Sequence, residues 1–203
     1  MAAVMDSSSL IFSFRVPKIY ALISKRYEKI LIPKAVFDET IIAGKLLGKP
    51  EVQSIESEIK KGRVTIGKAE KAVASETLGL GEREAIALAQ ARKLPLFCDD
   101  HKARVAASAL GVQAVPLTAF LLWAYRNKKT SQKESLEILD LLVTEGYRLK
   151  LDVYLALRKE ICSNADSGYL ENFASGPTLT ERDAQKFGAG VNRSLAKRLS
   201  KKA

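Results

Sequence analysis

Short apolar runs alternate with longer amphipathic segments over residues 2–116 of the chain. The runs are brief and rich in valine, isoleucine and leucine, which is typical of buried strands. They predict strands at residues 2–5, 30–32, 63–66, 94–98 and 112–116. The segments between them predict helices at residues 10–14, 19–27, 34–47, 52–61, 82–92 and 101–110.

This order of elements predicts an α/β fold, with a parallel, Rossmann-like sheet sandwiched by helices. After residue 118 the pattern is helical, with helices predicted at 119–127, 132–144 and 151–163. Residues 164–180 are rich in small and turn-forming residues, which indicates a linker. We therefore divide the chain into an α/β domain at 1–130, a helical continuation packed on its core at 131–163, and a linker with a basic C-terminal tail at 164–203.

The positive net charge of the chain indicates a negatively charged binding partner. Its 203 residues carry a formal net charge of +10, which favours a polyanion, either nucleic acid or an anionic membrane surface. The tail holds basic residues and no acid from residue 184 onward: Lys186, Arg193, Lys197, Arg198, Lys201 and Lys202. We expect these side chains to bind phosphate groups; the alternative is a tail that only adds solubility.

Several classes of protein are excluded by composition. The longest apolar runs are too short to span a bilayer and no stretch resembles a signal peptide, so we expect a cytoplasmic protein without membrane contact. His101 is the single histidine, which excludes histidine-based metal sites and catalytic triads. Cys98 and Cys162 lie in apolar segments and are expected to be buried free thiols.

Acidic residues recur beside stretches that are predicted to be buried. Asp6 follows the first strand, Glu39 and Glu84 lie on predicted helices, and the pair Asp99–Asp100 follows the strand at 94–98. Desolvating a lone carboxylate is costly, so repeated placements of this kind indicate that the acids converge on one site. Clustered carboxylates are the ligands that hard divalent cations prefer, and the pattern therefore predicts a metal site.

The first two acids each have a second interpretation. Asp6 lies at the carboxyl end of a parallel strand, where open α/β sheets bind ligands, but it could instead cap the next helix. The serines at 7–9 could also cap that helix, which favours a metal role for Asp6. Glu39 shares a helix face with apolar neighbours, whereas Asp38 is placed to pair with Lys34 at the surface.

The later acids also leave a choice open. Glu84 shares a face with apolar residues, whereas Glu82 belongs to the first helical turn, where an acid favourably meets the helix dipole. We prefer Glu84 as the ligand. If the extended chain continues after the strand, Asp99 and Asp100 point to opposite sides, so that one binds metal and the other caps the next helix. Asp100 is slightly favoured as the ligand.

The stretches VMDSSSLI, IPKAVFDETI and GLGEREAIALAQARKLPLFCDDHKARVAASALGV together resemble the PIN domain family over residues 2–125. The last stretch is especially similar to a largely archaeal subgroup related to the VapC toxins. The resemblance implies a PIN-like sheet and an acidic set of Asp6, Glu39, Glu84 and Asp100, with Asp99 as the alternative. Ser8 matches the small hydroxyl residue that often follows the first acid.

Two features of the chain depart from that family. Cys98 stands where the family commonly has threonine or serine, and a thiol is a weaker hydrogen-bond donor than a hydroxyl. The chain also continues well past the length of a typical VapC-type toxin. This extension argues against a simple toxin role.

The resemblance implies an endoribonuclease that depends on Mg²⁺ or Mn²⁺ and acts either as a toxin-like enzyme or in RNA processing. The expected partners are RNA, including ribosomal RNA or the ribosome, an antitoxin if the protein is a toxin, and a second copy of the chain. The alternative is a non-catalytic PIN-fold protein that binds RNA or ribosomes.

Overall fold

The computed structural model describes residues 1–69, 72–75 and 77–163. A five-stranded parallel sheet with strand order β3-β2-β1-β4-β5 lies at its centre. The strands are β1 (Ala2–Met5), β2 (Lys29–Pro33), β3 (Val64–Gly67), β4 (Leu96–Phe97) and β5 (Ala114–Val115). This sheet and its flanking helices confirm the predicted α/β class, with strand bounds that differ slightly from those predicted.

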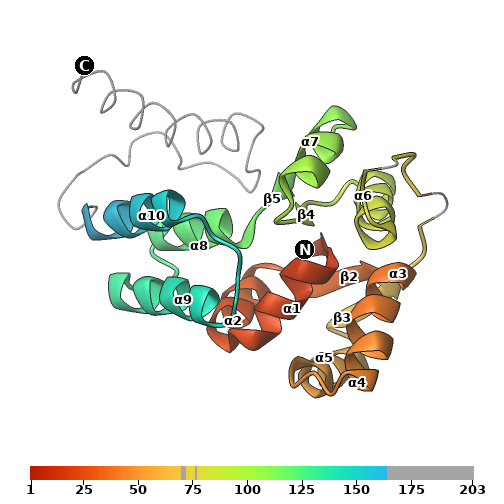
Figure 1. Cartoon of the computed structure of the whole chain (residues 1–203), viewed down its shortest axis with the longest axis horizontal. Helices are drawn as coiled ribbons and strands as arrows, with labels where there is room; N and C mark the ends of the chain where they lie inside the picture. Colours follow the sequence, from red (N-terminus) through yellow and green to blue (C-terminus); the bar gives the residue numbers. More distant parts are fainter. Residues whose placement is uncertain (70–71, 76, 164–203) are drawn as a thin grey trace.

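Helices cover the sheet and extend beyond its β5 edge (Figure 1). They are α1 (Ser7–Arg15), α2 (Pro17–Arg26), α3 (Lys34–Phe37), the π-helical segment η1 (Asp38–Ile42), α4 (Ala43–Leu46), α5 (Glu51–Lys60), α6 (Leu80–Arg92), α7 (His101–Ala109), α8 (Leu117–Arg126), α9 (Gln132–Thr144) and α10 (Leu151–Ser163). Helices α8, α9 and α10 gather at one end of the molecule, and α3, α4 and α5 lie at the other. Within the described ranges, no helix combines the length and apolar content needed to cross a membrane.

The strands divide their side chains between two hydrophobic clusters, because neighbouring residues of a strand point to opposite faces of a sheet. In β1, Ala3 and Met5 belong to the larger cluster, whereas Val4 belongs to the smaller one. The larger cluster also holds Ile138 of α9 and Ile161 of α10. The helical continuation therefore packs on the same core as the sheet; the domain boundary at residue 130 stays a prediction.

The predictions for the C-terminal end fall on residues without a structural description. The linker and the basic tail, with Lys186, Arg193, Lys197, Arg198, Lys201 and Lys202, lie outside the described residues. Their proposed contact with phosphate groups rests on the sequence alone.

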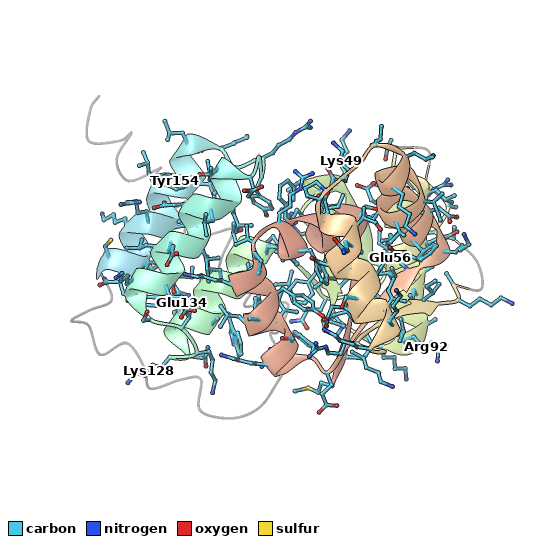
Figure 2. All side chains as sticks on the ribbon, turned by 90° about the horizontal axis from the view of Figure 1, so that it is seen from below. Lys49, Glu56, Arg92, Lys128, Glu134 and Tyr154 are labelled. Atoms are coloured by element: carbon cyan, nitrogen blue, oxygen red, sulfur yellow. The ribbon has the colours of Figure 1, made fainter. Side chains whose placement is uncertain are left out.

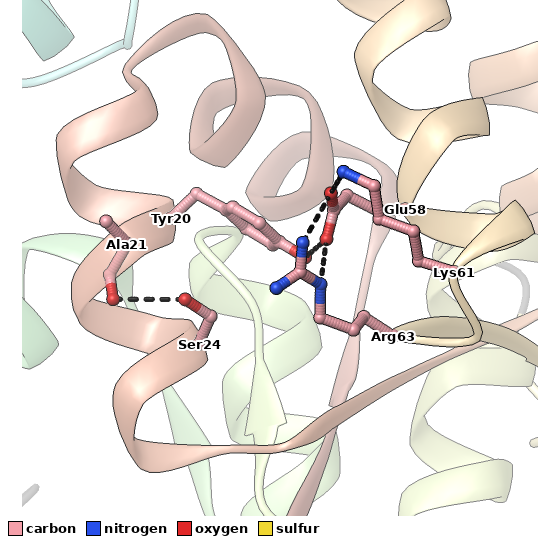
Figure 3. A network of polar contacts seen from close by, with 6 residues as sticks. All are labelled: Tyr20, Ala21, Ser24, Glu58, Lys61 and Arg63. Carbon is pink, nitrogen blue, oxygen red and sulfur yellow. Dashed lines mark hydrogen bonds and ion pairs between the residues drawn. The ribbon is translucent and has the colours of Figure 1, made fainter.

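A buried carboxylate joins α2, α5 and the start of β3 (Figure 3). Glu58 is 7% exposed and accepts hydrogen bonds from Arg63 Nη2 at 2.9 Å, Lys61 Nζ at 3.0 Å and the Tyr20 hydroxyl at 3.0 Å. Burial raises the pKa of Glu58, but these donors outweigh it, so its pKa lies below the ordinary value of 4.5. The network fixes the chain where it turns from α5 into the edge strand of the sheet.

Replacing Glu58 with glutamine is expected to lower the free energy of unfolding by about 1 kcal/mol at pH 7, since the two cations that it pairs with are half-exposed. A lowered pKa stabilises the fold above the unfolded value of 4.5, and this stability is lost as the pH falls through the folded value. The difference between the variant and the wild type should therefore shrink below pH 4.5 in urea titrations.

Glu56→Gln is the matched control for this prediction. Glu56 lies on the same helix and pairs with the exposed Lys45 at 2.6 Å, and Figure 2 shows it at the surface of α5. An exposed pair contributes little, so this variant should unfold like the wild type at every pH. Equal losses in the two variants would contradict a special role for the Glu58 network.

Candidate active site

Asp6 lies where β1 ends and α1 begins, and it is 2% exposed. Its Oδ1 accepts a hydrogen bond from the Ser9 backbone N–H at 2.7 Å, which caps α1. This cap explains why α1 begins earlier than the sequence pattern predicted. Asp6 also lines a pocket at the edge of the sheet. The cap is therefore present, and a metal role for Asp6 stays a prediction.

Asp99 lies beside Asp6 because the strands that precede them are neighbours, with Met5 opposite Phe97 in the register. Ser9 contacts both acids: its N–H donates to Asp6, and its hydroxyl donates to Asp99 Oδ2 at 3.1 Å. The Leu117 N–H and the Tyr147 hydroxyl both donate to Asp99 Oδ1. Two carboxylates from neighbouring strand ends thus share one small region.

The two acids change each other's protonation. Burial, followed by the negative charge of Asp99, raises the pKa of Asp6 from 3.8 to about 6. Burial also raises the pKa of Asp99, although hydrogen bonds from Tyr147, Leu117 and Ser9 oppose part of that rise. A site that resists holding two negative charges without a cation is typical of a metal or proton-transfer centre.

Asp100 caps the next helix, which is one of the two roles expected for this pair of aspartates. It is exposed, and its Oδ1 accepts from the Ala103 N–H at 2.8 Å to cap α7. The expected cap is therefore Asp100, and the shared contact with Ser9 makes Asp99 the neighbour of Asp6. A metal-ligand role for either residue stays a prediction.

The Cys98 thiol lies behind the two acids. It is buried, approaches the backbone carbonyl of Asp100 at 3.9 Å, and faces the Asp6 carboxylate. Burial, together with the charge of Asp6, raises the pKa of Cys98, so the thiol stays protonated and can donate weakly to Asp6. Cys162 is exposed, so the expected burial holds for Cys98 and is wrong for Cys162.

The pocket in front of Asp6 has a volume of about 270 Å³ and lies between the starts of α1 and α6 and the segment η1. It is lined by Asp6, Ser7, Ser8, Glu39, Gly79, Gly81 and Glu82. The Ser7 hydroxyl donates a hydrogen bond to Glu39 Oε2 and so joins the two walls. The structure thus brings Asp6 and Glu39, far apart in the sequence, to one pocket.

Glu39 does not lie on the buried stripe that regular helical spacing predicted. The segment that carries it is π-helical, and a π segment inserts an extra residue into a turn. Thr40 and Ile41 are buried, whereas Glu39 and Ile42 are exposed. The side chain of Glu39 therefore opens to the pocket, while Asp38 pairs with Lys34 at the surface as predicted.

Gly81 makes room for the carboxylate of Glu39. A Cβ atom at this position would lie 2.7 Å from Glu39 Oε2 and 2.9 Å from Oε1, closer than such atoms approach in proteins. The glycine is in the first turn of α6. A side chain there would displace Glu39 from its observed place in the pocket.

Glu82 and Glu84, the remaining acids, each accept a hydrogen bond from a backbone N–H at the start of a helix. Glu82 Oε2 accepts from the Gly79 N–H at 2.9 Å and lines the pocket. Glu84 Oε2 accepts from the Ala35 N–H at 2.9 Å, which supports the first turn of α3, and Glu84 is not among the pocket-lining residues. Among the described residues, no three side chains of His, Cys, Asp or Glu stand close enough together to form a ready metal cluster.

Three residues that shape the site were not singled out from the sequence. Ser9 was recognised only as a potential cap, although its hydroxyl also contacts Asp99. Gly81 lies in the sequence Gly79-Leu80-Gly81, which gives no sign of contact with Glu39. Tyr147 comes from beyond α9, and no local pattern connects it with Asp99.

Comparison with known proteins gives the following matches. A family model described as a PIN domain matches residues 2–163. No curated protein matches the chain. Among solved structures, a PilT N-terminus domain protein from the hyperthermophilic archaeon Sulfolobus solfataricus is similar, with 24% sequence identity and a TM-score of 0.43. That match covers 58% of this chain and 87% of the archaeal one.

Proposed function

The chain belongs to the PIN domain family, whose members are generally nucleases, and we propose that it is a divalent-metal-dependent endoribonuclease. The observation that carries this proposal is the adjacent pair of Asp6 and Asp99, held at neighbouring strand ends beside a pocket. This edge of a parallel sheet is where open α/β folds bind their ligands.

The donor atoms of the site fit a hard divalent cation such as Mg²⁺ or Mn²⁺. Asp6 and Asp99 offer carboxylate oxygens. Burial raises the pKa of both, the charge of Asp99 adds to the rise at Asp6, and a cation would relieve these costs. Asp6 and Asp99 would hold the ion, with Glu39 on the facing wall of the pocket. When bound, the ion would lower the pKa of a water molecule and offset negative charge on the phosphate.

The protein's own side chains would hold and orient the reactants. Ser9 fixes both aspartates through its N–H and its hydroxyl, and Ser7 fixes Glu39. The exposed carboxylate of Glu39, which lines the pocket, would accept a hydrogen bond from the attacking water. No nucleophilic side chain is required by this chemistry, because water would attack the phosphorus directly as the P–O bond to one ribose oxygen breaks.

The charge of the chain supports RNA as the substrate. A formal net charge of +10 attracts a phosphate backbone, and such contacts supply affinity without sequence choice. We assign phosphate contacts to the basic residues of the tail, from Lys186 to Lys202. Association with ribosomal RNA, an antitoxin or a second copy of the chain belongs to the same proposal.

The proposal is tested by incubating the purified protein with labelled single-stranded and hairpin RNA in Mn²⁺ or Mg²⁺. DNA of the same sequence and a sample with excess chelator serve as controls. The expected result is internal cleavage of RNA that the chelator stops. Cleavage that continues in chelator would contradict the metal dependence, and intact RNA under all conditions would contradict the nuclease.

A second candidate function is a non-catalytic PIN-fold protein that binds RNA or ribosomes. It is favoured by one observation: Glu84 supports α3, Glu82 bonds to Gly79, and no three His, Cys, Asp or Glu side chains of the described residues stand close enough together to hold a metal. Salt-sensitive RNA binding without cleavage in the same assay would select this alternative.

Gly81→Ala is expected to lower cleavage at least about tenfold without unfolding the protein, because the new Cβ would push Glu39 out of place. Alanine favours a helix over glycine, so the free energy of unfolding should stay equal or rise by up to about 1 kcal/mol. Cleavage rates and urea titrations measure the two effects separately.

Gly79→Ala is the control for this variant. Its Cβ would make an ordinary contact, 3.8 Å from Glu82 Oε2, so Glu39 keeps its place. We expect cleavage close to that of the wild type. A Gly81→Ala protein that cleaves at the wild-type rate would show that the observed place of Glu39 is not required.

A further inference from the structure

The connection between α9 and α10 sends a side chain into the acidic site. Tyr147 is 7% exposed, and its hydroxyl donates a hydrogen bond to Asp99 Oδ1 from 48 residues along the chain. The ring packs edge-on against Phe12 of α1, with centroids 5.2 Å apart. The helical end of the molecule thus contacts the same carboxylate that lies beside Asp6.

The turn that aims Tyr147 is fixed by its backbone. Gly146 has a φ of +90°, a conformation that glycine adopts readily, and its N–H donates to the Val143 carbonyl at 3.0 Å. The Tyr147 N–H donates to the Leu142 carbonyl at 2.9 Å, which completes a Schellman motif at the end of α9. The direction of the tyrosine therefore follows from how α9 terminates.

A second contact ties the same turn to the core. Arg15 Nη1 at the end of α1 donates to the backbone carbonyl of Glu145 at 3.3 Å, and its Nη2 bonds to the buried Glu51 at 2.9 Å. The turn is thus held at Glu145 by an arginine and at Tyr147 by an aspartate. Because the residues before and after Gly146 are both held, the turn has little freedom to move Tyr147 away from Asp99.

The hydrogen bonds to Asp99 determine which of its oxygens faces which neighbour. Oδ1 accepts from Tyr147 and from the Leu117 N–H at 3.0 Å. Oδ2 accepts from the hydroxyl of Ser9, whose backbone N–H also donates to Asp6. Without the hydroxyl of Tyr147, Asp99 Oδ1 would lose one of these two donors and keep only the Leu117 N–H. The carboxylate could then rotate away from its place beside Asp6.

We propose that Tyr147 is a positioning residue for Asp99, and that the α9–α10 hairpin is thereby a working part of the cation site. This inference rests on the proposed nuclease function. The helical continuation after residue 130 would thus help to hold the site, although the acids themselves lie earlier in the chain. Partners that orient a metal-binding carboxylate commonly change metal affinity or activity by about 10- to 100-fold when removed.

The test compares Tyr147→Phe with Tyr154→Phe in the full chain. Tyr154 of α10 also donates its hydroxyl to an aspartate, Asp140 Oδ1 at 2.6 Å, and Figure 2 places it among the helices at the far end from Glu56. Both variants lose one hydroxyl-to-carboxylate bond from the same hairpin, but only Tyr147 contacts Asp99. Calorimetric titration with Mn²⁺, steady-state RNA cleavage and thermal unfolding are measured for each.

We expect Tyr147→Phe to bind Mn²⁺ about tenfold more weakly and to lower kcat with little change in KM for RNA. Tyr154→Phe should match the wild type in Mn²⁺ affinity and in kcat. A Tyr147→Phe protein with wild-type affinity and kcat would overturn this inference alone and leave the nuclease standing. Equal losses in both variants would also overturn it, because they would reflect general stability. A wild-type protein that neither binds Mn²⁺ nor cleaves RNA would overturn the proposed function and this inference together.

Discussion

Asp6→Asn is expected to abolish metal-dependent RNA cleavage and, in the absence of metal, to make the protein more stable at neutral pH. Asparagine keeps a side-chain oxygen that can accept from the Ser9 N–H, so the cap of α1 survives. The variant removes a negative charge that the cation needs and that the metal-free fold tolerates poorly. Loss of function and gain of stability should therefore occur together.

The pH dependence of this gain follows from the raised pKa of Asp6. Its folded pKa is about 6 against an ordinary value of 3.8, so the stability from protonated Asp6 is complete below 3.8 and is lost as the pH rises through 6. In chelator at pH 7.5, Asp6→Asn should unfold with a free energy about 2 kcal/mol higher than the wild type. The two proteins should converge near pH 4.

Asp38→Asn is the control for the loss of an acid. Asp38 lies next to Glu39 but pairs with Lys34 at the surface, so its removal should leave cleavage and the pH profile of unfolding unchanged. A less stable Asp6→Asn protein at pH 7.5, or one that still cleaves RNA with Mn²⁺, would contradict the assignment of Asp6.

A large loss of RNA cleavage is also expected when Asp99, but not its neighbour Asp100, is replaced by asparagine. Asp99→Asn should lower cleavage at least about a hundredfold, because it removes the second carboxylate of the site. Its side-chain oxygen can keep the bonds from Leu117 and Tyr147, so the fold is retained. Asp100→Asn should cleave within about twofold of the wild type, since asparagine caps a helix as well as aspartate does.

Both proteins are assayed with the same RNA at saturating Mn²⁺, after their folds are compared by circular dichroism. Because the two residues are adjacent and carry the same change, any general effect on the β4–α7 connection appears in both. If Asp99→Asn were active and Asp100→Asn inactive, the cation would be bound by Asp100 and not by Asp99.

The strands and most helices were predictable because local periodicity determines them. The residues of β1 alternate between two hydrophobic clusters, and the order of strands and helices leaves a parallel sheet as the natural arrangement. Bounds shifted where a cap acted, as at α1, where Asp6 starts the helix ahead of its first large apolar residue. The placement of Asp6 at a strand end was foreseeable for the same reason.

The details of the site depend on contacts that the sequence does not encode locally. The π-helical segment at Asp38–Ile42 rotated Glu39 off the buried stripe, and regular spacing could not anticipate it. The sequence could not show whether the extended chain ends before or after Asp99, and this single residue decides which aspartate caps α7. The contact of Tyr147 with Asp99, 48 residues away in the sequence, depends on how α9 ends.

The proposed nuclease depends above all on Asp6 and Asp99 holding a divalent cation together. Crystals of the wild type soaked in Mn²⁺ and measured for anomalous scattering test it most directly. We expect an anomalous peak between the carboxylates of Asp6, which lines the pocket, and Asp99, which lies beside it. A peak only at other residues, or none at a Mn²⁺ concentration that supports cleavage, would contradict it.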